Sequence, residues 1–177
     1  GVEEMAKLND LNHEATRELS GTRSTNKAGL AIGTVKSGID TANTLQYSIN
    51  GIAYTKAAVT STALVAAPGS RSFVVIPAGK TCYIVMCINA AGTIYAVQGE
   101  YTGQLFVSQT NAPTVDAYCS RIGVLRVPDT PNDLAPFGLI KVVNGSGSDF
   151  TIGTTLFDAA SITTTFTDLQ VEPATNP

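Results

Sequence analysis

The feature that most constrains this chain is a series of short apolar runs separated by glycine- and proline-containing turns. The series begins near residue 41 and repeats at intervals of roughly ten residues. Asn50 and Gly51 lie between two alternating runs and favour a tight hairpin, because a type I′ turn needs two residues with positive φ. Residues 81–89 are almost continuously apolar, which is typical of a buried central strand. The pattern predicts an all-β body, an antiparallel sandwich or a barrel-like fold.

Further strands are expected on both sides of this central run. They are predicted over residues 45–49, 52–54, 71–76, 94–98, 105–108, 118–127, 137–143, 150–152 and 162–171. Cys82 and Cys87 are an odd number of residues apart, so on one strand they would point to opposite faces. Together with Cys119 they are expected to be reduced, small apolar residues of the core.

The first 36 residues have a different composition. They hold five basic and five acidic side chains, although the whole chain has 11 basic and 14 acidic ones. Apolar residues within 2–20 are spaced three or four apart, which predicts a short helix with one apolar stripe. The stripe consists of Met5, Leu8, Leu11, Ala15 and Leu19. Residues 20–36 are rich in glycine, serine and threonine and are predicted to be a linker or an extended arm. We therefore expect two parts, an N-terminal arm over residues 1–36 and a β-sandwich body over residues 37–177.

The helical stripe needs a surface on which to pack, because so short a helix is marginally stable alone in water. Its partner is either the body of the same chain or another subunit or protein. We take the stripe as the predicted contact with a neighbouring subunit or with a larger assembly.

The composition argues against several classes of function. Charged residues make up 14% of the chain, where a globular protein has about a quarter. The net charge of −3 disfavours a nucleic-acid partner. No window approaches the roughly 20 consecutive apolar residues of a membrane span. The first residues also lack the cationic and apolar regions of a secretory signal, so synthesis in the cytoplasm is expected.

Signatures of catalysis and of cofactor binding are absent from the sequence. It contains no phosphate-binding loop, dinucleotide fingerprint, HExxH or GxSxG motif. One histidine, His13, and three dispersed cysteines disfavour a zinc site. Loop carboxylates such as Glu100 with Asp116, or Asp129 with Asp133, are candidates for a glycosidase pair, but solvated loop acids explain them better. The sequence therefore predicts a protein that is not an enzyme and needs no cofactor or metal.

Several stretches resemble a family of tailed-bacteriophage virion proteins. Residues 48–58 (SINGIAYTKAA) resemble its hairpin motif I-[DN]-G-x-x-Y-x-K. The pattern continues in residues 121–124, 138–142, 150–157 and 162–169, and the similarity covers about residues 30–171. These motifs are turn and strand signatures, so no catalytic or binding residue carries over.

The resemblance implies a β-sandwich structural protein of the phage particle, with capsid cement (decoration) proteins as the closest role. The expected partners are further copies of the chain, as a homotrimer, and the major capsid protein. The expected location is the capsid surface, after synthesis in the host cytoplasm. A head-fibre, neck or tail receptor-binding module of the same virion is the alternative, and it would occur in far fewer copies per particle. A β-fold glycan hydrolase is a third possibility.

Overall fold

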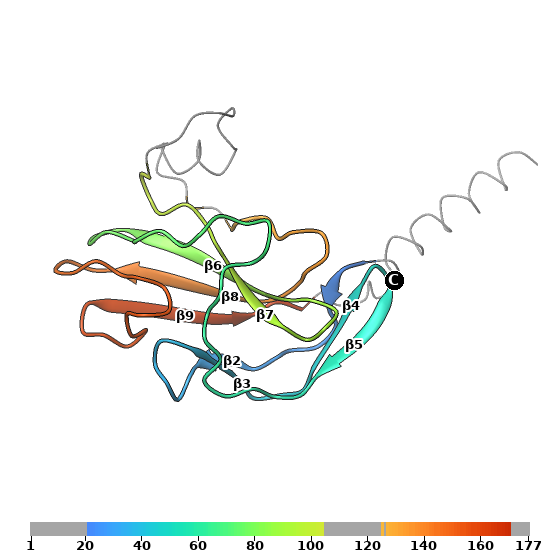
Figure 1. The fold of residues 1–177 in the computed structure, drawn as a ribbon. Helices are drawn as coiled ribbons and strands as arrows, with labels where there is room; N and C mark the ends of the chain where they lie inside the picture. Colours follow the sequence, from blue (N-terminus) through green and yellow to red (C-terminus); the bar gives the residue numbers. More distant parts are fainter. Residues whose placement is uncertain (1–20, 105–124, 126, 171–177) are drawn as a thin grey trace, which may run out of the picture.

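A computed structural model of the chain describes residues 21–104, 125 and 127–170, and every regular element in them is a β-strand. The larger sheet is antiparallel and has the strand order β7-β6-β8-β9 (Figure 1). Its strands are β6 (Thr81–Ile88), β7 (Ile94–Gln98), β8 (Ala135–Asn144) and β9 (Ile162–Asp168). The mainly β fold class predicted from the sequence is confirmed.

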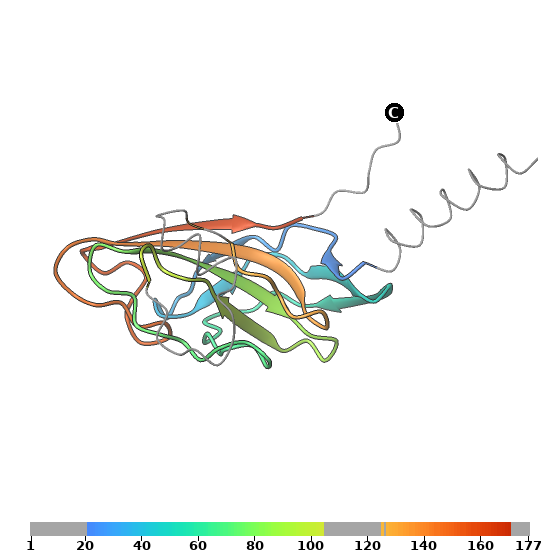
Figure 2. The same ribbon diagram turned by 90° about the horizontal axis from the view of Figure 1, so that it is seen from above.

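Two smaller antiparallel sheets form a second layer. One has the order β1-β4-β5 and the other pairs β2 with β3. These strands are β1 (Arg23–Ser24), β2 (Leu30–Ile32), β3 (Ile39–Thr41), β4 (Leu45–Ile49) and β5 (Ile52–Lys56). Figures 1 and 2 show them stacked on one face of the larger sheet. The main core fills the space between the layers and includes Ile84 and Ile140 from one side and Leu45 and Tyr47 from the other.

The β4–β5 hairpin forms as the sequence predicts. Asn50 has a φ of 51° and Gly51 a φ of 80°, the two positive values that a type I′ turn requires. In the ladder Tyr47 lies opposite Tyr54, and their rings stack with centroids 5.6 Å apart. The turn therefore sets the register, and the aromatic pair reinforces it.

Strand β6 is buried on both faces, in agreement with its continuous apolar sequence. Ile84 and Met86 face the main core, whereas Val85 and Cys87 belong to a second cluster on the other face. Cys82 is in the main core and is a free thiol, as is Cys87, so the predicted opposite orientation of these two cysteines is confirmed. Cys119 lies outside the described residues.

Residues 21–36, which belong to the stretch predicted to be a linker or an extended arm, take part in the sheets of the body. This stretch supplies β1, which pairs with β4, and β2, which pairs with β3. Ala28 is fully buried and Leu30 is nearly so. Small and polar side chains make the stretch resemble a linker, although Ala28 and Leu30 belong to the core and Ile32 packs against it. This part of the predicted arm therefore lies in the body.

Two predicted strands are absent from the described structure. Residues 71–76 form no strand, and only Ile76 makes a bridge, with Phe150. Residues 150–152 contain that bridge and then a turn. Their apolar side chains are nevertheless used, because Ile76, Phe150 and Ile152 are buried in the core. Apolar residues at these positions anchor irregular segments to the core and do not continue the sheet.

Other expectations fall on residues outside the described ranges. These are the helix over residues 2–20 with its stripe, the strand over residues 105–108 and most of the strand over residues 118–127. Leu125 and Val127 are described, and neither is in a strand.

Candidate functional site

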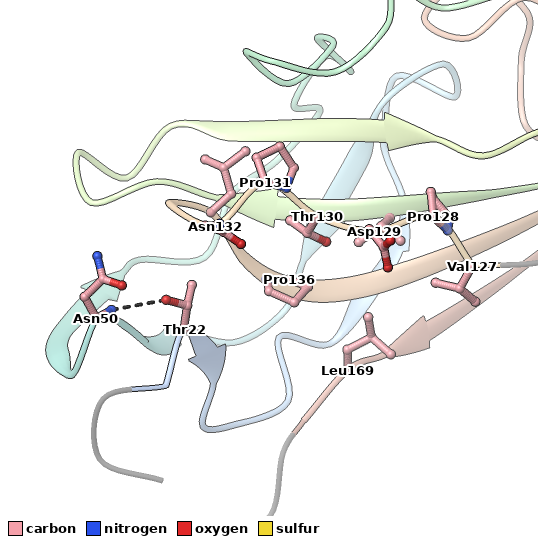
Figure 3. A pocket seen from close by; sticks show the side chains of 12 residues that line it. Thr22, Asn50, Val127, Pro128, Asp129, Thr130, Pro131, Asn132, Pro136 and Leu169 are labelled. Carbon is pink, nitrogen blue, oxygen red and sulfur yellow. Dashed lines mark hydrogen bonds between the residues drawn. The ribbon is translucent and has the colours of Figure 1, made fainter. Parts of the chain in front are cut away.

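The candidate site is a pocket at one end of the body. Its volume among the described residues is about 640 Å³. A proline-rich loop lines one side with Pro128, Pro131 and the residues between them, and the outer face of the larger sheet contributes Val85 of β6 and Pro136 of β8. Figure 3 shows Thr22 and Asn50 at one end of the pocket and Val127 and Leu169 at the other.

Hydrogen bonds fix the segments that meet at this pocket. The backbone N–H of Asn50 donates to Thr22 Oγ1 at 3.1 Å, which ties the β4–β5 turn to the start of β1 (Figure 3). The backbone N–H of Leu169 donates to the Phe137 carbonyl at 3.0 Å and holds the segment after β9 against β8. The backbone N–H of Leu134 donates to the Pro131 carbonyl at 3.0 Å and closes the loop. The pocket is thus built from segments far apart in the sequence.

Both ends of the described chain are at this pocket. Thr22 and Leu169 line it, and each is one residue from an end of the described ranges, at Gly21 and Gln170. The Gln170 side chain donates from Nε2 to the Thr25 carbonyl at 3.3 Å, so the two ends are also in contact. Residues 1–20, which contain the predicted apolar stripe, are therefore covalently joined to the body beside the pocket.

The described lining of the pocket contains few ionisable groups. Among the described residues that line it, Asp129 is the only ionisable one, and prolines, threonines and asparagines supply most of the surface. A general acid–base mechanism needs two titratable groups or a nucleophile with an adjacent base. The described lining offers neither. Ile52, which follows the Asn50 turn, is 59% exposed.

Three of the four carboxylates considered for a glycosidase pair lie in the described residues, namely Glu100, Asp129 and Asp133. The Glu100 carboxylate forms an ion pair with Arg71 Nη2 at 2.7 Å and is 10% exposed, which is a structural role in the segment beside β7. Asp116 lies outside the described residues. Asp129 and Asp133 are both exposed on the proline-rich loop.

The two described cysteines are poorly suited to nucleophilic chemistry. Burial raises the pKa of Cys82 to about 12, and burial also raises the pKa of Cys87 to about 12. At neutral pH both are thiols, whereas the reactive form of cysteine is the thiolate. They act as small core residues.

Metal-binding and membrane-spanning features are not found in the described part of the chain. No group of three or more histidine, cysteine, aspartate or glutamate side chains is placed to hold a metal ion there. The same residues contain no helix that is long and apolar enough to cross a bilayer.

The charges of the described residues are few and balanced. Seven are basic and seven are acidic, so these residues are neutral overall. The basic ones are Arg23, Lys27, Lys36, Lys56, Arg71, Lys80 and Lys141, and the acidic ones are Asp40, Glu100, Asp129, Asp133, Asp149, Asp158 and Asp168.

In comparisons with known proteins, no family model, no curated protein and no solved structure matches this chain. The pocket itself is not predictable from the sequence, because Thr22, Asn50 and Leu169 carry no shared motif and meet only in the fold. The cluster of prolines at 128, 131 and 136 marks the loop that lines it, and this is the one local signal in the sequence.

Proposed function

We propose that this chain is a structural protein of a tailed-bacteriophage virion, a capsid cement protein that binds the outside of the head. It acts as a homo-oligomer, which we expect to be a trimer, and stabilises the shell by bridging capsomers of the major capsid protein. The resemblance of residues 48–58 and of the later strand signatures to such proteins supports this role. The antiparallel two-layer body is compatible with it.

The observation that carries the proposal is the charge-poor body, to which a segment with a predicted apolar stripe is joined beside a pocket. A monomeric β protein with few surface charges risks association through its edges and faces. In an assembly of identical subunits, contacts between neighbours would bury such a surface. The arm, joined at Gly21, would extend the contact by placing its stripe on a neighbouring subunit or on the capsid.

Modest affinity for each copy is sufficient in this mechanism. A standard protein interface buries about 800 Å² per partner, and linked or repeated contacts raise the effective affinity by orders of magnitude. Many copies, each bound moderately, would hold adjacent capsomers together. No reaction and no cofactor are required.

Binding to phage heads that lack this protein tests the proposal. Purified full-length chain is mixed with such heads, and copies per head are measured by quantitative gel densitometry and electron cryomicroscopy. We expect hundreds of copies on the outer shell and greater resistance of the shell to heat. A handful of copies at the neck or tail, or no binding, would contradict the cement role.

A matched pair of variants tests the arm. Leu11→Asp puts a charge into the predicted apolar stripe, whereas His13→Asp puts the same charge on the opposite, polar side of the predicted helix. We expect Leu11→Asp to lower head binding at least tenfold and His13→Asp to leave it unchanged, with both bodies folded as judged by thermal unfolding. Equal binding by both variants would remove the arm from the mechanism.

The alternative, a receptor-binding module of a head fibre, neck or tail, is favoured by one observation. The proline-rich loop that lines the pocket is the kind of surface loop on which binding sites are found. Copy number separates the two roles, because a fibre or tail module occurs in only a few copies per particle. Binding of the purified chain to host cells would support the alternative.

A further inference from the structure

Strand β9 forms an open edge of the larger sheet. It pairs with β8 along its whole length, from Gly138 opposite Asp168 to Asn144 opposite Ile162. On its other side no described strand pairs with it, and Figure 2 shows it along one margin of the described body. Apart from its ladder with β8, no backbone hydrogen bond of residues 163–167 to another described residue is present.

The opposite edge of the same sheet is covered by the chain itself. Ala66 bridges Ala96 of β7, and Ala96 exchanges backbone hydrogen bonds with Val65 and Ala67 at 2.8 and 3.0 Å. Further along, the Gln98 side chain bonds both the N–H and the carbonyl of Val74. The fold therefore closes one edge and leaves the other available.

The sequence of β9 lacks the devices that usually protect an exposed edge. Natural edge strands carry lysine, proline or a bulge that prevents pairing with another chain. The seven residues of β9 read ITTTFTD, with no lysine, arginine or proline and no irregularity in the register with β8. Thr163, Thr165 and Thr167 are exposed on one face. A long, regular edge with a single charged residue at its end is a template for strand addition.

We propose that β9 pairs antiparallel with β9 of a second copy about a two-fold axis at Thr165, which joins the two larger sheets into one. An isologous contact of this kind needs a strand that is complementary to itself. With the axis at Thr165, Thr163 lies opposite Thr167 of the second copy, and the two Thr165 residues face each other. Threonine pairs directly opposite each other favour antiparallel pairing.

Charge is compatible with this register. Asp168 is the only charged residue of β9, and in the proposed pairing it lies opposite Ile162 of the second copy. The two Asp168 residues are six positions apart along the joined strands, about 20 Å at 3.4 Å per residue. That separation exceeds the Debye length of about 8 Å at physiological ionic strength, so their repulsion is screened. Asp168 Oδ1 also accepts the Leu30 N–H at 2.9 Å within its own chain.

Another edge strand, β5 of the smaller three-stranded sheet, is a poorer template for the same contact. It has five residues against seven in β9, and it ends in Lys56, the residue type that protects edges most often. Its exposed Thr55 nevertheless provides a matched control position on an edge strand. The proposed β9 contact does not depend on the phage role, because it rests on the strand alone. A two-fold contact joins copies in pairs, so in a trimeric assembly it would link copies of different trimers.

Sedimentation of the full-length chain with two matched lysine variants tests the proposal. Thr165→Lys brings two like charges together at the two-fold axis, whereas Thr55→Lys puts the same charge on β5. We expect Thr165→Lys to reduce the average mass at micromolar concentration to about half, and Thr55→Lys to keep the wild-type mass. If wild type and Thr165→Lys have the same mass, or if Thr55→Lys dissociates as strongly, the proposal is wrong.

Two double variants with opposite or like charges at Thr163 and Thr167 test the register, and each is checked for folding. The double variant Thr163→Lys with Thr167→Glu places opposite charges against each other twice in the proposed pairing, while Thr163→Lys with Thr167→Lys places like charges there. We expect the first to associate as wild type does and the second to dissociate. Circular dichroism and thermal unfolding establish that both are folded. Dissociation of both, or of neither, would exclude the Thr165-centred register.

Discussion

The two edges of the larger sheet differ in what lies beside them. Along β7, residues 65–76 run beside the strand without forming one, and backbone and side-chain groups satisfy its outer hydrogen bonds. Along β9, the outer groups meet no described strand. The covered edge uses irregular backbone, a glutamine and an ion pair, whereas the open edge is regular and rich in threonine. Among the described residues, the larger sheet therefore has one edge covered by its own chain and one edge without a strand partner.

The largest expected effect comes from shortening Ile76, the core residue that holds the segment of residues 65–76 beside β7. Ile76 is fully buried and bridges Phe150, so Ile76→Ala should lower the free energy of unfolding by about 2–5 kcal/mol through lost burial and a cavity. Val75→Ala, one residue away at a side chain that is 44% exposed, should change it by less than about 0.5 kcal/mol. Chemical denaturation measures both. Similar losses of unfolding free energy in the two variants would mean that Ile76 does not hold residues 65–76 to the core.

A smaller effect is expected from removing the Gln98 side chain, which hydrogen-bonds the Val74 backbone at the covered edge. The Val74 N–H donates to Gln98 Oε1 at 2.8 Å, and Gln98 Nε2 donates to the Val74 carbonyl at 3.0 Å. Gln98→Ala removes both bonds and should cost about 1–2 kcal/mol of unfolding free energy, with faster hydrogen exchange at the Val74 amide. The exposed Gln46 on β4 is the control, and Gln46→Ala should have almost no effect. Unchanged exchange at Val74 would contradict the role of Gln98.

The smallest effect is expected at the open edge. Thr165→Ala at low protein concentration should change the free energy of unfolding by less than about 0.5 kcal/mol, because the side chain is exposed. Thr41→Ala is the contrast, since Thr41 is 5% exposed and its Oγ1 accepts the Val59 N–H at 3.0 Å. That change should cost about 1–3 kcal/mol. A Thr165→Ala loss as large as that of Thr41→Ala would show that the open edge contributes to the stability of a single copy.

Local signals predict the parts of the fold that local chemistry determines. The Asn50 and Gly51 turn and the continuous apolar run of β6 are recognisable because positive φ and two-sided burial leave direct traces in the sequence. The sequence of residues 71–76 resembles a strand because apolar side chains within it pack on the core. An irregular segment that packs in this way has the same apolar composition as a strand. Residues 21–36 resemble a linker because pairing partners, not composition, make β1 and β2 strands.

The candidate site is less predictable than the fold. Its pocket depends on the meeting of Thr22, Asn50 and Leu169, and long-range contact of this kind leaves no motif in a single sequence. The predicted arm stripe, with Leu8 and Leu11 at its centre, stays a prediction because it lies outside the described residues. The open edge of β9 is not recognisable from sequence because edge position depends on the order of strands in the sheet.

The contact between the two ends of the described chain has a consequence for protein engineering. Because Gln170 bonds Thr25, a short linker from Gln170 to Gly21 would close the body into a ring. New ends could then be opened at Gly69 or Gly79, where a β-carbon added to the glycine would meet no atom of a non-neighbouring residue within 4 Å. A circular permutant made in this way would keep every strand pairing. The order in which the strands are synthesised is therefore separable from the architecture that they form.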